Sequence, residues 1–358
     1  MNELNVPLSR RAALRAAAAA ALAPALALRA AAEVQAEETP PKGVARMKRE
    51  AKALAPFVRS DLARRFLADA EDALPTIPTR TLLRDPATRA LLTEAEATKR
   101  DEAARKALQT VTLDEERYYD TKYGTPLAYA RAVDLLAEVG KVPDVAGKRL
   151  LDFGYGTVGH LRLLAGLGAE VVGVDVDPFL TLLYSRPGDT GAVPASTAAK
   201  GKRAGRVTLV DGQWPADRAT KDAVGGGFDA IVSKNTLKNG YLHPAQPVDK
   251  RMLVDLGVSD EAYVKALRDA LKPGGVVLIY NLSPAPAKPG EPYKPWADGR
   301  CPFPREAWEK AGFAVVAFDV NDDKPAREMA RLLKWDAPPT KMDVENDLFA
   351  LYTVVRKK

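Results

Sequence analysis

From residue 149 to the end of the chain, short apolar runs alternate with segments in which apolar residues recur every three or four positions. This alternation is typical of an α/β domain with a doubly wound, mostly parallel sheet. Seven runs are expected to be strands: 149–153, 170–176, 206–210, 228–233, 276–281, 313–320 and 348–355. Helices are expected between them at 158–167, 178–184, 260–271 and 305–311. The last strand follows a long segment with no expected helix, which allows that strand to insert antiparallel between its neighbours.

The region before this domain has a helical pattern. We expect helices at about 44–72, 86–108 and 126–139, and we find no run of alternating β-branched residues there. Residues 33–43 are polar and contain prolines, as in a linker. The sequence therefore predicts an α-helical N-terminal region over 44–139, packed on a main domain over 140–358.

The first 32 residues have the pattern of an export signal. The pair Arg10 and Arg11 precedes an Ala/Leu run at 16–28, and small residues suited to cleavage follow at 30–32. The paired arginines resemble a twin-arginine signal. The apolar run, about 13 residues long, is too short for a stable membrane span. We expect export to the periplasm, and the alternative is a loosely helical arm of a cytoplasmic protein.

Composition narrows the chemistry. The chain has 53 basic and 47 acidic side chains, and this modest excess is spread along the sequence, so we expect no nucleic-acid partner. The single cysteine, Cys301, excludes an internal disulfide and a cysteine-based zinc site. With His160 and His243 as the two histidines, we expect no metal site.

A glycine-rich segment, Leu-Asp-Phe-Gly-Tyr-Gly-Thr-Val-Gly at 151–159, follows one expected strand and opens a helix. Gly154 and Gly156 suit a tight turn where a ligand approaches the backbone, and amides at the helix start offer donors to an anionic ligand. Asp175 ends the next strand, where an acidic residue binds a ribose diol. With Gly159 the spacing also fits a dinucleotide fingerprint, so spacing alone does not choose the cofactor.

The order of motifs resembles that of class I S-adenosylmethionine-dependent methyltransferases. Asp152 stands two positions before the first glycine, Asp211 and Gly212 follow the third strand, and the segments 228–233, 271–275 and 311–313 come in the family's order. The resemblance covers about 118–358 and implies a Rossmann-like, seven-stranded sheet with S-adenosyl-L-methionine as cofactor. It implies these cofactor-binding residues: Asp152, Gly154, Gly156, Asp175, Val176, Asp211 and Gly212. Val158 departs from the family, which often has a third glycine there, and would narrow the methionine pocket.

The segment that follows the fourth strand, 233–244, is the expected acceptor side. Asn235 and Tyr241 are candidates for hydrogen bonds to a substrate, and His243 or Lys234 for accepting a proton; a solvated loop is the alternative. Residues 118–124 resemble the lid that such enzymes fold over the cofactor, although aromatic packing explains them nearly as well. The loop 283–296, with Tyr293 and Trp296, is a second candidate lid, and we expect His160 to be packed or capping.

Three functions follow from these patterns. The first is a methyltransferase acting on a small molecule or a protein. The second is an exported, non-catalytic binding protein with the same fold, because S-adenosylmethionine is made in the cytosol and export would separate an enzyme from its supply. The third is an NAD-dependent oxidoreductase, which Asp152 and the terminal strand disfavour.

Replacing both arginines of the export motif tests the signal. In Arg10→Lys/Arg11→Lys we expect the protein to stay in the cytosol, because the translocase reads the arginine pair. Fractionation of cells that express either form measures this, and an unchanged distribution would contradict the assignment.

Overall fold

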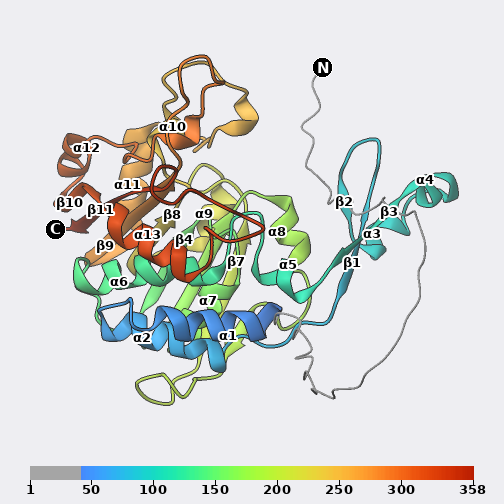
Figure 1. Cartoon of the computed structure of the whole chain (residues 1–358), viewed down its shortest axis with the longest axis horizontal. Coiled ribbons are helices and arrows are strands. Elements are labelled where there is room, and N and C mark those ends of the chain that lie inside the picture. The colour runs from blue at the N-terminus through green and yellow to red at the C-terminus, as the bar shows by residue number, and fades with distance from the viewer. Residues whose placement is uncertain (1–41) are drawn as a thin grey trace, which may run out of the picture. The chain divides into compact units, whose positions relative to one another are not determined.

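Eight strands form the main sheet of the computed structural model, which describes residues 42–358 (Figure 1). The predicted signal and nearly all of the linker lie outside the described residues. The strands are β4 (Arg149–Phe153), β5 (Glu170–Asp175), β6 (Gly191–Val193), β7 (Gly205–Asp211), β8 (Phe228–Lys234), β9 (Leu271–Ser283), β10 (Phe313–Asn321) and β11 (Phe349–Lys357). Their order across the sheet is β10-β11-β9-β8-β4-β5-β7-β6.

The seven expected strands are all present, and β7, β5, β4, β8 and β9 run parallel to one another. Strand β11 pairs antiparallel with both β9 and β10, as its place in the chain allowed. The expected number of strands is wrong by one, because β6 adds an antiparallel edge strand. Its three residues lie in a polar stretch and are too few for an alternating pattern to be visible.

Strand β9 also begins earlier than expected. Residues 272–275, just before the expected start at 276, lie inside this strand as an irregularity: Phe228 pairs with Leu271, and Ala230 already pairs with Val276.

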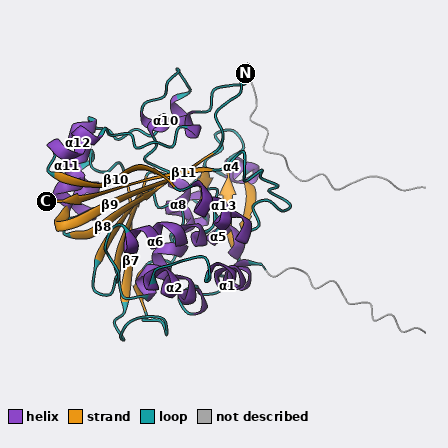
Figure 2. Ribbon diagram, turned by 60° about the vertical axis from the view of Figure 1, so that its left-hand side comes forward, coloured by secondary structure: helices purple, strands orange, loops and turns teal. Residues whose placement is uncertain are grey.

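Helices cover both faces of the sheet. Figure 2 shows α1 (Gly43–Leu54), α2 (Asp61–Ala68) and α6 (Ala130–Glu138) on one side, and α11 (Asp260–Ala270) and α12 (Arg305–Lys310) on the other. Side chains of β9 alternate between two cores: Val276 and Leu278 pack with α6 and α7, whereas Val277 and Ile279 pack with α11 and α12. Burial on both faces explains why the strands are continuous apolar runs. The helices of this domain are α7 (Gly159–Gly166), α8 (Pro178–Leu183), α9 (Arg218–Val224), α10 (Asn239–Leu242), α11 (Asp260–Ala270), α12 (Arg305–Lys310) and α13 (Asp323–Leu332).

The N-terminal region is only partly helical, so the expectation of an all-helical extension is wrong in its middle. Its helices are α1 (Gly43–Leu54), α2 (Asp61–Ala68), α3 (Glu94–Ala97), α4 (Glu102–Ala107), α5 (Glu115–Tyr119) and α6 (Ala130–Glu138), with short 3₁₀ turns at η1 (Asp69–Glu71) and η2 (Pro126–Tyr129). A separate antiparallel sheet has the order β2-β1-β3, from β1 (Arg80–Arg84), β2 (Leu91–Leu92) and β3 (Gln109–Leu113). Its strands are two to five residues long and bury only Arg80, Leu82 and Leu113, so they lack the apolar run that marks a buried strand.

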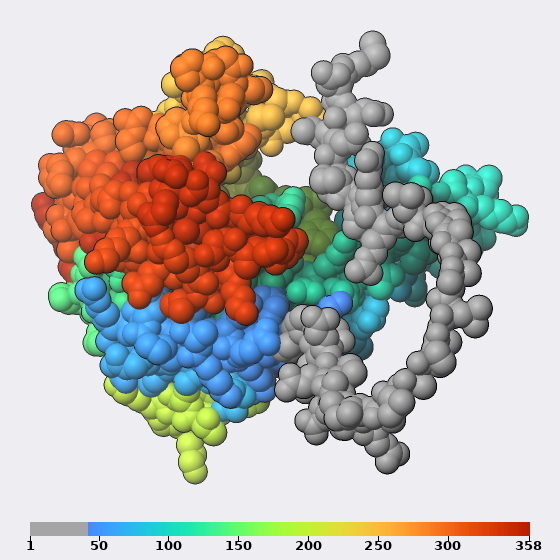
Figure 3. Space-filling model, in the orientation of Figure 1, coloured from blue at the N-terminus to red at the C-terminus, as the bar shows by residue number. Residues whose placement is uncertain are grey.

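The start and the end of the described chain pack together. Met47 of α1 and Met329 of α13 belong to the same buried core. Figure 3 shows the C-terminal segment, in red, directly against the N-terminal helices, in blue. Within residues 42–358 no helix has the length and apolarity that a membrane crossing requires.

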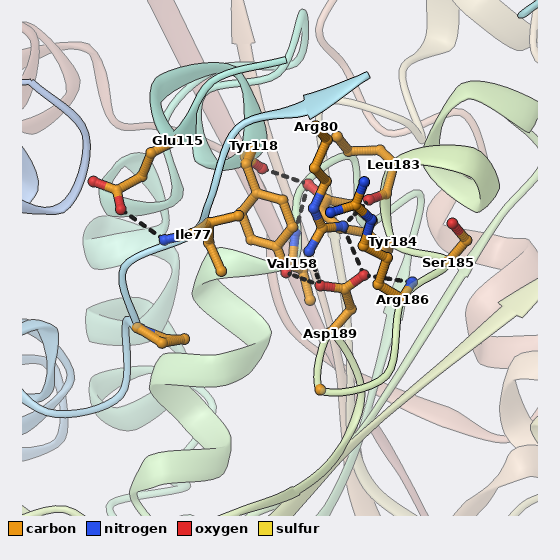
Figure 4. Close-up of polar contacts among 12 residues, drawn as sticks. Ile77, Arg80, Glu115, Tyr118, Val158, Leu183, Tyr184, Ser185, Arg186 and Asp189 are labelled. Atoms are coloured by element: carbon orange, nitrogen blue, oxygen red, sulfur yellow. Dashed lines mark hydrogen bonds and ion pairs between the residues drawn. The ribbon is translucent and has the colours of Figure 1, made fainter. Parts of the chain in front are cut away.

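A buried ion pair ties the small sheet to the main domain (Figure 4). The Arg80 guanidinium lies 2.6 Å and 2.8 Å from the two carboxylate oxygens of Asp189, in the loop after α8, and donates to the Leu183 carbonyl at 2.5 Å. The Tyr118 hydroxyl and the Arg186 amide donate to the same carboxylate, at 2.9 Å and 2.8 Å. The buried charge of Asp189 therefore depends on donors from three separate segments.

Breaking this pair should destabilise the protein. In Arg80→Met the Asp189 carboxylate stays buried without its counter-ion, which we expect to lower the free energy of unfolding by about 3 kcal/mol. Urea denaturation measures the change. The matched control is Arg84→Met on the same strand, since Arg84 forms no ion pair within residues 42–358. Equal stability of the two variants would show that the pair contributes nothing.

Candidate cofactor and substrate cavity

A cavity of about 1070 Å³ lies where the carboxyl ends of β4, β5, β7 and β8 meet. The carboxyl ends of parallel strands form the crevice in which ligands of open α/β sheets bind. Of the ten predicted site residues, eight line this cavity: Gly154, Gly156, Asp175, Val176, Asp211, Gly212, Asn235 and Tyr241. The other two, Asp152 and His243, do not.

The turn between β4 and α7 requires glycine at two positions. Gly154 and Gly156 have φ of +76° and +59°, in the left-handed region that other residues avoid. A Cβ on Gly154 would collide with the Thr236 hydroxyl, and one on Gly156 would lie 2.7 Å from the Tyr123 Cβ. The turn thus presents bare backbone between two flanking side chains.

Two carboxylates stand side by side at the ends of β5 and β7, because Asp175 and Asp211 are register partners. One oxygen of Asp175 accepts the amides of Val176 and Asp177 at 2.8 Å and 3.1 Å. Its other oxygen accepts the Gly156 amide at 3.3 Å. Burial raises the pKa of the Asp175 carboxyl, while these backbone donors lower it. Asp175 therefore holds the glycine turn to β5 and still borders the cavity.

Asp152 is buried outside the cavity lining and is bound by a histidine. One Asp152 oxygen lies 2.5 Å from Nε2 of His160, and the His160 ring stacks on Tyr129 with centroids 3.5 Å apart. His160 is fully buried, and burial lowers the pKa of its imidazole. The arrangement is that of a packed histidine, and it leaves Asp152 without direct access to a ligand in the large cavity.

The segment 121–123 covers the glycine turn. The Thr121 hydroxyl donates to the Gly156 carbonyl at 2.7 Å, and the Tyr123 hydroxyl donates to Asp177 at 2.7 Å. The Lys122 ammonium also lies 2.7 Å from Asp177. Of the second expected lid, Trp296 lines the cavity, whereas the Tyr293 hydroxyl lies outside its lining and accepts the Ala245 amide at 3.0 Å.

Val158 does not narrow the cavity, because its side chain is fully buried behind the turn. Its backbone is helical, with φ −78°, so the position does not need glycine. The Val158 amide donates to the Tyr184 hydroxyl at 3.2 Å, and that hydroxyl donates to the Tyr118 carbonyl at 2.9 Å. Tyr118 also donates to Asp189, so this chain of bonds joins the glycine turn to the ion pair in Figure 4.

The segment after β8 forms the other side of the cavity. Asn235 has φ +66°, and its side-chain oxygen accepts the Leu282 amide at 2.7 Å, which fixes the turn after the strand. Tyr241 lines the cavity from α10. His243 is partly exposed and lies 2.9 Å from Asp260, outside the lining. This placement gives no support to the expected role of His243 as a proton acceptor.

Sequence reasoning did not single out several residues that line the cavity: Lys122, Gln213, Trp214, Thr236, Lys238 and the segment 251–255. The segment 251–255 follows a 3₁₀ turn, η3 (Lys250–Met252), in a polar stretch without periodicity. Lys238 lies in the expected acceptor segment, 233–244, but only the fold shows that it is buried.

No family model matches this chain, and no curated protein matches it. Solved structures that it resembles include a cyclopropane synthase from Mycobacterium tuberculosis, with a TM-score of 0.38, 14% identity, and coverage of 64% of this chain and 85% of that one. A second is a magnesium protoporphyrin IX methyltransferase from Synechocystis, with a TM-score of 0.33, 16% identity, and coverage of 65% of this chain and 81% of that one. A third is an S-adenosylmethionine-dependent methyltransferase from Mesorhizobium loti, with a TM-score of 0.35, 16% identity, and coverage of 64% of this chain and 98% of that one. The function proposed below depends on the geometry of the cavity.

Removing the Tyr184 hydroxyl should loosen the glycine turn. In Tyr184→Phe the Val158 amide loses its acceptor, so we expect this amide to exchange faster with solvent and the protein to lose about 1 kcal/mol of stability. Hydrogen exchange read by NMR measures both. Tyr155→Phe is the control, because Tyr155 packs beside Tyr184 but bonds to nothing within residues 42–358 through its hydroxyl. Unchanged exchange at Val158 would show that the contact does not support the turn.

Proposed function

We propose that this chain is an S-adenosylmethionine-dependent methyltransferase whose cofactor binds over the glycine turn. One observation carries the proposal: Asp175 and Asp211, on register-paired strand ends, border the same cavity as the bare backbone of Gly154 and Gly156. An adenosine-bearing ligand needs an acceptor for its ribose hydroxyls and another near its exocyclic amine, and the proposal assigns these two carboxylates to the two roles.

The cavity has the size and chemistry that the cofactor requires. Ligand pockets generally measure about 300–1,000 Å³, so 1070 Å³ leaves room for a second molecule beside the cofactor. In this arrangement Asp175 binds the ribose, Val176 flanks the adenine and Asp211 accepts from its amine. Gly212 belongs to the same edge of the cavity. Asp152, bound by His160, acts only through the turn that follows it.

The sheet supports this cofactor over a dinucleotide. A dinucleotide-binding fold has the parallel order 3-2-1-4-5-6. Here β7-β5-β4-β8-β9 reproduces the first five strands, but the antiparallel β11 separates β9 from β10. The long segment before the last strand allowed this insertion, and a dinucleotide-binding fold does not have it.

When bound, S-adenosylmethionine supplies a methyl carbon for in-line displacement. The protein has to align the two molecules and exclude water. Tyr241 and Asn235 stand on the acceptor side, and Tyr123 and Trp296 border the cavity from two separate loops. The acceptor is a small molecule or a protein side chain.

Calorimetric titration with S-adenosylmethionine, S-adenosylhomocysteine and NAD tests the cofactor. We expect the two sulfur compounds to bind and NAD not to. In Asp175→Asn the loss of a charge-assisted hydrogen bond should raise the Kd of S-adenosylhomocysteine about 10- to 100-fold. Asp222→Asn, at an exposed position on α9, is the control and should bind as the unaltered protein does.

Two other results would replace the proposal. Binding of NAD without binding of S-adenosylhomocysteine would favour an oxidoreductase. Binding of S-adenosylhomocysteine, with no methylated product detected by mass spectrometry from any acceptor in an extract, would favour the exported, non-catalytic binding protein.

A further inference from the structure

Two buried lysines line the cavity on the acceptor side. Lys234 ends β8, and Lys238 immediately precedes α10. Their residues are only 7% and 4% exposed, and both border the large cavity. Lysine is almost never buried to this degree without a partner.

Neither ammonium has an anionic partner in the described part of the chain. Lys238 donates to the carbonyls of Leu282 at 2.5 Å and Trp296 at 3.4 Å, which leaves its charge uncompensated. Lys234 makes no side-chain hydrogen bond within residues 42–358, and its Nζ lies 5.2 Å from the centre of the Tyr129 ring. By contrast, Lys122 on the same cavity is paired with Asp177.

The electrostatic cost of this arrangement shows in the pKa values. Burial lowers the pKa of Lys234 to about 8, with Asp152 acting in the opposite direction. Burial and the neighbouring Lys234 lower the pKa of Lys238 to about 7. The Asp152 carboxylate offsets part of this cost for Lys234 alone, and no carboxylate within residues 42–358 does so for Lys238. An anion between the two lysines would relieve both penalties.

The charges of the cavity are also segregated. Asp175 and Asp211 stand at the ends of β5 and β7, whereas the lysines follow β8, on the other side of β4. Strands lie about 4.8 Å apart, so about 10 Å separates β8 from β5. Lys238 donates to carbonyls at the end of β9, one strand farther from β5 than β8 is, and in η4 (Pro295–Ala297). Among the charged side chains at the strand ends, the two carboxylates therefore lie on one side of β4 and the two lysines on the other.

We propose that the methyl acceptor carries an anionic group, a carboxylate or a phosphate, which binds between Lys234 and Lys238. This inference rests on the proposed function for the identity of the occupant as an acceptor. The anion site itself follows from the two unpartnered lysines and can be tested separately.

Equilibrium dialysis with labelled sulfate and labelled acetate, with and without S-adenosylhomocysteine, tests the site. Sulfate stands for a phosphate and acetate for a carboxylate. The anion that binds more tightly therefore identifies which of the two groups the methyl acceptor carries. In Lys234→Gln and Lys238→Gln we expect the anion to bind at least about ten-fold more weakly, as for the loss of a charged hydrogen bond. The Kd of S-adenosylhomocysteine should stay unchanged.

Two matched variants separate this role from a structural one. Lys234→Arg keeps the charge and should retain anion binding. Lys272→Gln removes an exposed lysine that is paired with Asp229, and should bind the anion as the unaltered protein does. Thermal melting confirms that each variant is folded. Binding should also weaken between about pH 7 and pH 9, since both lysines lose protons there while sulfate and acetate keep their charge.

The outcomes distinguish this inference from the proposed function. Lysine-dependent anion binding without binding of S-adenosylhomocysteine would support the anion site and contradict the methyltransferase. Binding of S-adenosylhomocysteine with no anion bound would overturn the anion site alone. An equal loss of S-adenosylhomocysteine and anion binding in the two lysine variants would also overturn it, because the lysines would then hold the carboxylate of the cofactor.

Discussion

The backbone has to reverse from the end of β4 into α7 within a few residues, and it does so at the centre of the sheet. At this place the ends of β5 and β8 stand on either side, so a side chain on the turn would occupy the space that a ligand needs. Gly154 and Gly156 meet this constraint with left-handed conformations and no Cβ. The carboxylates on one side and the lysines on the other face a common space only because this turn stays small.

Support for the turn comes from behind, through the N-terminal region. Thr121 binds its carbonyl, and Tyr184 binds the amide of Val158. The same tyrosine reaches Tyr118, which shares the Asp189 carboxylate with Arg80. The position and the rigidity of the glycine turn therefore depend on residues that precede the α/β domain in the chain. The region before residue 140 is a structural part of the site as well as a cover.

The sequence predicted the buried parts of the fold well and the exposed parts poorly. Strands such as Val276–Asn281 are covered on both faces, so their apolar runs are unmistakable, and Asp175 and Asp211 could be located from where such runs end. Strands β1 and β3 are five residues long and bury only Arg80, Leu82 and Leu113, so they have no comparable pattern. Helix α13 was missed because the residues it buries are only Ala326, Met329 and Ala330. The burial of Lys238 and the binding of Asp152 by His160 arise from tertiary packing, which no local pattern encodes.

The position of β11 has a consequence for the order of assembly. Strand β10 precedes it in the chain, yet β10 touches the sheet only through β11, which lies between β10 and β9. During synthesis, residues 313–321 therefore leave the ribosome with no partner for their hydrogen-bonding groups, and β9 keeps an open edge beside them. When residues 349–357 emerge, they form β11, which pairs with β9 and β10 at the same time. A nascent chain that stalls before that point therefore exposes the unpaired edges of two strands, which are prone to pair with other molecules.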